Sequence, residues 1–170
     1  MSLIRIVITG PESTGKTLLS KQLAEHFKTD WIPEYAREYV ENLDRAYTFE
    51  DVEKIAKKQI ETDKQIFKKT NDLVFIDTWL IITKVWFTEV YKNVPDWIHE
   101  HIISSKIDLF LLCKPDIEWA EDPLRENKNK RDYLFQKYKA ELDFYKFKYE
   151  IVSGTGKNRF LNALKLIEKI

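Results

Sequence analysis

The most informative segment of the chain is Gly10-Pro11-Glu12-Ser13-Thr14-Gly15-Lys16-Thr17. It fits the pattern G-x-x-x-x-G-K-[ST], whose glycines let the backbone wrap closely around phosphate groups. In this pattern Lys16 reaches the β and γ phosphates of ATP, and the hydroxyl of Thr17 binds Mg²⁺. We therefore expect ATP to be held by Gly10, Glu12, Ser13, Thr14, Gly15, Lys16 and Thr17.

The residues on either side of this loop supply the context that the pattern requires. Residues 4–9 form a short apolar run that is typical of a buried strand. Residues 14–27 follow as an amphipathic helix, whose N-terminus directs its positive dipole end towards a bound anion. The alternative is a glycine turn that merely joins a strand to a helix, but the flanking elements favour the phosphate-binding loop.

The rest of the chain alternates short β-branched runs with longer helical stretches. Further strands are expected at 30–32, 73–77, 107–113 and 150–152. Helices are expected at 33–40, 48–69, 78–91, 96–104, 133–144 and 159–170, with Thr48 as an N-cap. The charged segment 118–131 is predicted to be a mobile lid. The pattern predicts an α/β P-loop NTPase, a single domain over 1–170 with a parallel five-stranded sheet flanked by helices.

Composition argues against several other classes of protein. The chain of 170 residues carries 28 basic and 28 acidic side chains, so it lacks the positive excess expected of a nucleic-acid-binding protein. Cys113 is the only cysteine, which excludes an intramolecular disulfide and favours a reducing compartment. The apolar N-terminal run is too short for a signal peptide or a membrane span, so a cytoplasmic protein is expected. The pattern predicts no particular oligomeric state.

Asp77 ends the expected strand 73–77 and is the best candidate for a second Mg²⁺ ligand beside Thr17. P-loop enzymes use a carboxylate to help hold this metal, usually at the end of a neighbouring apolar strand. The alternative role for Asp77 is the N-cap of the helix that follows, and the two roles are compatible.

Glu34 follows the second expected strand, where P-loop nucleoside kinases place the carboxylate that accepts the proton of the substrate hydroxyl. Arg37 comes three residues later on the same helical face. Both are therefore candidates for contact with the phosphate acceptor. The alternative is a surface ion pair between Glu34 and Arg37, which would contribute little to stability.

Two further segments lie at the edge of the sheet where the strands end. Arg125 and Arg131 belong to the expected lid and are candidates for stabilising the transferred phosphate group, although such a charged run is also typical of a solvated surface. Gly154 and Gly156 follow the last expected strand. Because ligands bind beyond the carboxyl ends of parallel strands, their loop is expected either to shape an adenine pocket or to form a plain tight turn.

The aromatic residues divide into two groups. Trp79 and Trp86, seven residues apart on one expected helix, are interpreted as core packing, as is Tyr138. Trp31 and Trp119 each lie beside a candidate site segment and are candidates for stacking on a ring.

Several of these segments together resemble the ribosylnicotinamide kinase domain of NadR-type proteins, within the broader AAA-like P-loop group. The resemblance spans nearly the whole chain. The phosphate-binding loop is common to many families, whereas the other segments are more specific in their order. They are Glu34-Tyr-Ala-Arg-Glu-Tyr39, Phe75-Ile-Asp-Thr78, Trp119-Ala-Glu-Asp-Pro-Leu-Arg125 and Arg131.

The resemblance implies ATP-dependent phosphorylation of the 5′-hydroxyl of nicotinamide riboside to give nicotinamide mononucleotide. It implies that Glu34 and Arg37 bind the riboside and that Asp77 serves the metal or the attacking hydroxyl. It also implies that Arg125 and Arg131 contact the phosphates. Full-length relatives can carry an adenylyltransferase domain and a helix-turn-helix, which are not expected here because one kinase-like domain accounts for the 170 residues.

Two positions depart from the family pattern. Pro33 stands where the family has an aromatic residue before the matching Glu, and Trp79 stands where it tends to have an acidic residue. Both positions are expected to touch the acceptor site, so the resemblance predicts ATP binding more directly than the acceptor. Two alternative functions therefore remain: a kinase of another nucleoside or nucleotide, and a regulatory P-loop ATPase without a small-molecule acceptor.

Overall fold

The computed structural model describes residues 3–66 and 72–168. Within these ranges five strands form one sheet in the order β2-β3-β1-β4-β5, and every neighbouring pair is parallel. This confirms the predicted sheet, and each strand begins and ends within two residues of its expected position. The strands are β1 (Ile4–Thr9), β2 (Asp30–Ile32), β3 (Leu73–Asp77), β4 (Leu109–Cys113) and β5 (Tyr149–Val152).

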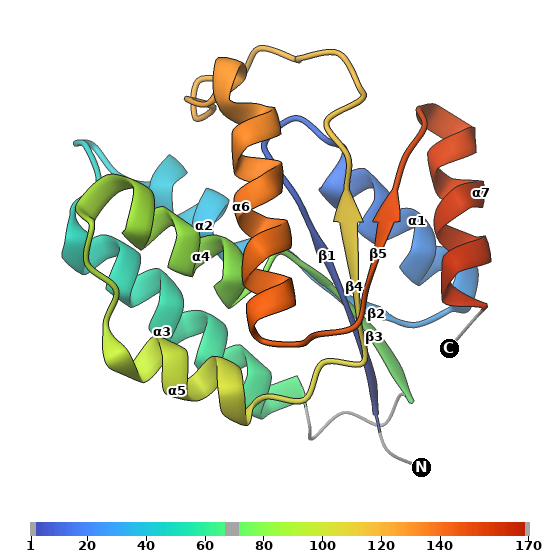
Figure 1. Cartoon of the computed structure of the whole chain (residues 1–170), viewed down its shortest axis with the longest axis horizontal. Coiled ribbons are helices and arrows are strands. Elements are labelled where there is room, and N and C mark those ends of the chain that lie inside the picture. Colours follow the sequence, from blue (N-terminus) through green and yellow to red (C-terminus); the bar gives the residue numbers. More distant parts are fainter. Residues whose placement is uncertain (1–2, 67–71, 169–170) are drawn as a thin grey trace.

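Helices cover both faces of this sheet, α1 and α7 on one side and α3, α4, α5 and α6 on the other (Figure 1). The central strands are buried on both faces, because their alternate side chains enter the two cores in turn. Seven α-helices lie in the described ranges: α1 (Lys16–Phe27), α2 (Tyr35–Glu41), α3 (Phe49–Ile66), α4 (Leu80–Trp86), α5 (Asp96–Ser104), α6 (Arg131–Phe144) and α7 (Gly156–Ile167).

The helices differ from their expected bounds in a few informative places. The helix expected at 78–91 begins only at Leu80 and continues from Phe87 to Tyr91 as a π-helix. Thr48 lies just before α3, where its backbone N–H donates to the carboxylate of Asp51 at 2.9 Å. The last residues expected for the helices 48–69 and 159–170 fall partly outside the described residues.

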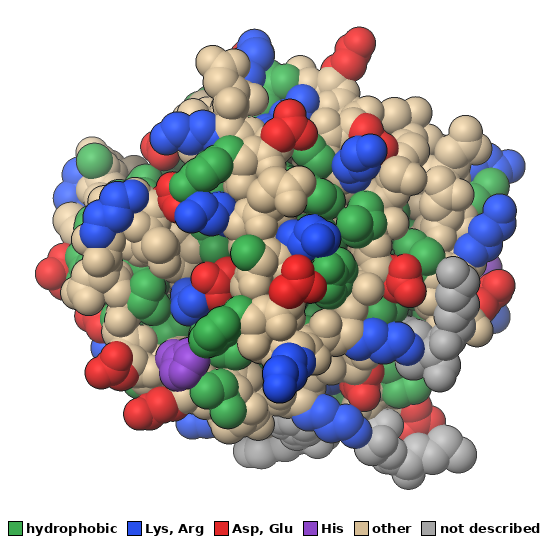
Figure 2. Space-filling view, in the orientation of Figure 1, with side chains coloured by type: hydrophobic (Ala, Val, Ile, Leu, Met, Phe, Trp, Pro, Cys, Tyr) green, Lys and Arg blue, Asp and Glu red, His purple; other side chains and the backbone are tan. Residues whose placement is uncertain are grey.

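All the carboxyl ends of the parallel strands meet at one edge of the sheet, at the top of Figure 1. The loop after β1 and the segment after β4 both lie at this edge, as does the loop after β5. On the face shown in Figure 2, basic and acidic side chains are interspersed. None of the helices in the described ranges combines the length and apolar character needed to cross a membrane.

Candidate functional site

The loop of residues 10–17, from here on the P-loop, is packed tightly against the end of β4. A Cβ atom added to Gly10 would lie 2.7 Å from the backbone oxygen of Cys113, so this position has room only for glycine. Ser13 and Gly15 also adopt positive φ angles, of 55° and 73°. These turns delay the start of α1 to Lys16, two residues after the expected start, and point the helix N-terminus into the loop.

Two side chains of the P-loop hold its shape from within. The hydroxyl of Thr14 donates to the backbone oxygen of Pro11 at 2.8 Å, and Nζ of Lys16 donates to the same oxygen at 2.7 Å. Lys16 therefore lies folded across the concave side of the loop. In this position its ammonium group is available to an anion that enters the loop.

Asp77 lies directly beside the P-loop. The hydroxyl of Thr17 donates to Oδ2 of Asp77 at 2.5 Å. Asp77 is 1% exposed, and its Oδ1 is buried with no hydrogen-bond partner among the described residues. Burial raises the pKa of this carboxyl group, although the Thr17 hydroxyl and Lys16 oppose the shift. Asp77 is not the N-cap of α4, because that helix begins at Leu80 with Trp79 in the cap position.

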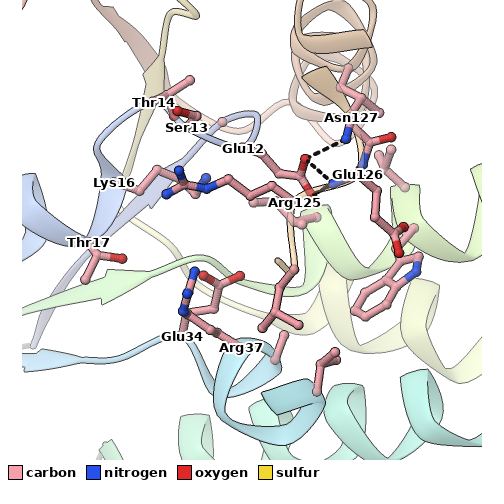
Figure 3. Close-up of a pocket in the computed structure, with 18 of the residues that line it drawn as sticks. Glu12, Ser13, Thr14, Lys16, Thr17, Glu34, Arg37, Arg125, Glu126 and Asn127 are labelled. Carbon is pink, nitrogen blue, oxygen red and sulfur yellow. Dashed lines mark hydrogen bonds between the residues drawn. The ribbon is translucent and has the colours of Figure 1, made fainter. Parts of the chain in front are cut away.

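Glu34 lies at the start of α2, and its carboxylate faces the P-loop across a cavity (Figure 3). Burial raises its pKa, while nearby Lys16 acts in the opposite direction and Asp77 adds to the rise. The alternative ion pair between Glu34 and Arg37 is not formed. Arg37 instead pairs with Glu41 at 2.8 Å on its own helix and with Asp122 of the lid at 2.7 Å.

This cavity has a volume of about 760 Å³ and runs from the P-loop to an apolar end. Glu34 and Arg37 line its middle section, and Arg125, Glu126 and Asn127 of the lid line it from above (Figure 3). The apolar end is formed by side chains from the loop before α3, from α4 and its π-helical extension, from the lid, and from α6. They are Tyr47, Ile82, Val85, Trp86, Val90, Leu124, Leu134 and Tyr138.

The lid, residues 118–131, lies over the P-loop and is bound to it at several points. The backbone N–H of Ala120 donates to the Ser13 hydroxyl at 2.9 Å, and that of Asn127 donates to the Glu12 carboxylate at 2.9 Å. Arg131 donates to the backbone oxygen of Ser13 at 3.2 Å. The lid is therefore tied to the P-loop at these points, while several of its charged side chains, such as Glu121, Lys128 and Lys130, are exposed to solvent.

The comparisons with known proteins agree with this geometry. A model of the AAA domain family matches residues 5–159. The chain belongs to this family. It is 26% identical over 176 residues to the trifunctional NAD biosynthesis/regulator protein NadR of Salmonella typhimurium, an alignment that covers 97% of this chain and 42% of the relative. It is 29% identical over 124 residues to the Escherichia coli protein of the same name, an alignment that covers 71% of this chain and 30% of the relative. The chain therefore spans less than half the length of these curated relatives.

Solved structures show that this AAA domain shares its fold with P-loop kinases. A crystal structure of a NadR protein in complex with NR matches with a TM-score of 0.86 at 24% identity, covering 98% of this chain and 51% of that one. A NadR protein in complex with NAD and AMP-PNP matches with a TM-score of 0.81 at 23% identity, covering 98% of this chain and 49% of that one. Thymidylate kinase from Ehrlichia chaffeensis matches with a TM-score of 0.69 at 13% identity, covering 98% of this chain and 99% of that one. The chain is thus a NadR-like P-loop domain with the fold of nucleoside and nucleotide kinases.

The two departures of this AAA domain from the NadR pattern lie outside the large cavity. Trp79 is 2% exposed, and its indole N–H donates to Asp63 at 2.7 Å inside the core. The expectation that Trp79 touches the acceptor site is therefore wrong, because its ring packs behind the site. Pro33 lines a second, smaller cavity of about 180 Å³ together with Trp31, Thr17 and Asp77.

The two glycines after β5 lie apart from these cavities, since neither Gly154 nor Gly156 lines either of them. The N–H of Gly154 donates to the carboxylate of Asp116 at 2.8 Å, and its backbone oxygen accepts a bond of the same length from Arg159. The loop is a hydrogen-bonded turn that ties the ends of β4 and β5 together. The adenine-pocket interpretation of this loop stays a prediction.

Part of the cavity wall was not predicted from the sequence. Trp79 is core, as predicted, but Trp86 is only partly buried and lines the cavity beside Tyr47, with the ring centroids 4.8 Å apart. Tyr138 is buried and also faces the cavity. Trp119 belongs to the lid, and its ring centroid lies 6.0 Å from the guanidinium of Arg125 and 5.7 Å from that of Arg131. The seven-residue spacing of Trp79 and Trp86 favoured a buried face, so it gave no signal that Trp86 lines a cavity.

Proposed function

We propose that the chain is an ATP-dependent kinase that phosphorylates the 5′-hydroxyl of nicotinamide riboside to give nicotinamide mononucleotide. The observation that carries this proposal is the continuity of one cavity. It joins the P-loop, the carboxylate of Glu34 and the apolar end that contains Tyr47 and Trp86. This apolar end is called the chamber from here on. A riboside can therefore lie with its ring in the chamber and its 5′-hydroxyl between Glu34 and the P-loop.

The aromatic and acidic side chains at the apolar end are suited to a cationic ring, although Arg45 also lines the cavity and Lys137 lies 3.8 Å from Glu89. Tyr47 and Trp86 offer aromatic faces, and the carboxylates of Glu89 and Glu126 line the same region. Glu126 accepts a hydrogen bond from the hydroxyl of Tyr47 at 3.2 Å, which keeps this carboxylate beside the ring. Aromatic faces and carboxylates both attract cations. The nicotinamide ring of the riboside is a pyridinium cation, whereas the common nucleosides carry neutral bases.

The positions of the polar side chains support a direct transfer of the phosphate group. The 5′-oxygen attacks the γ-phosphorus of ATP, its proton passes to the carboxylate of Glu34, and the bond to the bridging oxygen of ADP breaks. The raised pKa of Glu34 makes it a stronger base than a free carboxylate. Lys16 and Arg125 stabilise the negative charge of the phosphates. Arg131, at the end of the lid, adds a third positive charge to this stabilisation.

The side chains of Thr17 and Asp77 fit a bound Mg²⁺ ion. Oδ1 of Asp77 is a buried oxygen without a partner among the described residues, and Thr17 adds a hydroxyl oxygen beside it. Both are the hard ligands that Mg²⁺ prefers. In the described ranges no three His, Cys, Asp or Glu side chains are grouped to hold a metal ion by themselves. The ion would therefore be held jointly with phosphate oxygens, whose charge it would neutralise.

The first test is ADP release by the purified chain with Mg·ATP, with and without nicotinamide riboside and a panel of other nucleosides. Strong stimulation by nicotinamide riboside, with nicotinamide mononucleotide identified by mass spectrometry, is expected. The Lys16→Ala variant should lose this turnover. ADP release that no acceptor stimulates would favour a regulatory ATPase, and stimulation only by another nucleoside would replace the proposed acceptor.

A matched pair of substrates tests the charge argument separately. The reduced riboside has a neutral dihydropyridine ring of almost the same size as the pyridinium ring. We expect its kcat/KM to be about 3- to 30-fold lower, the range of a cation–π interaction. Equal values for the two ribosides would show that the chamber recognises shape and not charge.

A further inference from the structure

Glu12 belongs to the P-loop, yet its side chain turns towards the lid (Figure 3). The carboxylate accepts hydrogen bonds from the backbone N–H of Asn127 at 2.9 Å and of Glu126 at 3.2 Å. The side-chain amide of Asn127 adds a third donor at 3.4 Å. A carboxylate in a loop that binds a triphosphate is electrostatically unfavourable, because like charges repel. Its presence at this position therefore indicates a role other than the ATP binding that the sequence pattern led us to expect for Glu12.

The contacts of Glu12 fix the lid on one side of Arg125. On the other side, the N–H of Ala120 donates to the hydroxyl of Ser13 at 2.9 Å. Arg125 lies between these two anchors and donates to the backbone oxygen of Ala120 at 2.6 Å. Two consecutive P-loop residues thus hold the two sides of the lid segment that carries Arg125.

We propose that Glu12 is a positioning residue that docks the lid on the P-loop and thereby places Arg125 over the transferred phosphate group. The role of Arg125 in this statement rests on the proposed kinase function. The docking itself does not rest on that function, because Glu12 contacts the lid directly. Two of its three donors are backbone N–H groups, so the carboxylate is the partner that a substitution can remove.

The chemistry of the contact makes Glu12→Gln an informative variant. A carboxylate offers two acceptor oxygens, and hydrogen bonds to an ionised acceptor are about twice as strong as neutral ones. Glutamine has nearly the same shape but only one acceptor, and its NH₂ group would face the N–H donors of the lid. The substitution therefore weakens the docking without opening a cavity in the P-loop.

Limited trypsin digestion measures the docking directly, because the lid contains the cleavage sites Arg125, Lys128, Lys130 and Arg131. We expect Glu12→Gln to be cleaved within 118–131 about tenfold faster than the wild type, since cleavage follows the population of the open lid. The control is Glu25→Gln, which removes an exposed carboxylate of α1 outside the lid. It should be cleaved at the wild-type rate. Equal cleavage rates for Glu12→Gln and the wild type would overturn the proposal.

Kinetics then separate positioning from a merely structural role. Glu12→Gln should lower kcat by about 10- to 100-fold, the scale of a misplaced catalytic group, while the KM for ATP changes less than about threefold. Arg125→Ala should lower kcat by a much smaller factor in the Glu12→Gln variant than in the wild type, because Arg125 is already displaced in that variant. Equal costs in both backgrounds would contradict the proposal. The digestion needs no acceptor, so it gives an answer even if nicotinamide riboside is not the substrate.

Discussion

The hydroxyl of Thr17 donates a hydrogen bond of 2.5 Å to Oδ2 of Asp77, and Oδ1 of the same carboxylate is buried without a partner among the described residues. Burial raises the pKa of Asp77 above its value in the unfolded chain. At neutral pH the ionised group is therefore less favourable in the folded state than in the unfolded state. Its charge therefore destabilises the ligand-free protein at neutral pH, and the Mg²⁺ ion proposed for this site would offset that cost.

The first prediction is that Asp77→Asn raises the melting temperature of the ligand-free protein at pH 7.5 while abolishing Mg²⁺-dependent turnover. Asparagine keeps an acceptor for Thr17 and removes the buried charge. Each kcal/mol gained corresponds to about 2–4 °C for a chain of this size. The gain should shrink as the pH is lowered, because the Asp77 carboxyl then takes up a proton in the folded wild type. Calorimetry at pH 7.5 and pH 5 measures both values.

The control for this prediction is Asp116→Asn. Asp116 forms an ion pair with Arg159 and accepts the N–H of Gly154, so loss of its charge should lower the melting temperature. A lower melting temperature for Asp77→Asn as well would contradict the prediction, because it would show that the ionised Asp77 carboxylate stabilises the folded protein.

Glu34 gives the second prediction. Glu34→Gln should reduce phosphoryl transfer by about 10²-fold or more and leave ATP affinity roughly intact, because only the proton acceptor is removed. Since burial raises the pKa of Glu34, wild-type activity should fall as the pH is lowered through that raised pKa. The variant should lose this acidic limb of its pH–rate profile. Glu25→Gln, on the exposed side of α1, is the control and should behave as the wild type.

A parallel fall of ATP affinity and transfer in Glu34→Gln would assign Glu34 a structural role. A retained acidic limb would assign the titration to another group, such as Asp77, which also has a raised pKa.

The features that depend on local sequence were predictable. The strand bounds, the P-loop and the neighbouring Thr17 and Asp77 all follow from the apolar runs and the residues that end them. The parallel sheet brings strand ends to one edge whatever the details of packing. Trp79 was also correctly assigned to the core.

The features that depend on how distant segments pack were not predictable. The chamber wall combines Tyr47, from a loop, with Trp86, from α4, and lid residues more than thirty positions further on. The heptad spacing of Trp79 and Trp86 suggested one buried face, but Trp86 turns only partly inward and ends α4, where the π-helix begins. The partner of Arg37 was likewise missed, because Asp122 is 85 residues away in sequence.

Gly10 gives the third prediction. Gly10→Ala should lower the free energy of unfolding by about 2–5 kcal/mol, because the new Cβ meets the Cys113 backbone and φ is 140°. Gly156→Ala is the matched control, since its Cβ would enter open space and only its φ of 49° is unfavourable. Gly156→Ala should lower the free energy of unfolding by about 1–2 kcal/mol. Urea denaturation measures both, and equal costs would show that the P-loop moves away from β4 easily.

Trp86 gives the fourth prediction, which tests the chamber itself. Trp86→Leu should raise the KM for nicotinamide riboside by about 3- to 30-fold, the range of a lost cation–π contact, and leave the KM for ATP unchanged. Leucine keeps an apolar wall but has no aromatic face for the cationic ring. The control is Trp97→Leu, because Trp97 on α5 is also partly buried against the core but does not line the cavity. Trp97→Leu should lower stability and leave both KM values unchanged. If Trp86→Leu changes the two KM values equally, Trp86 supports the P-loop side of the site, and the ring of the acceptor must lie elsewhere in the cavity.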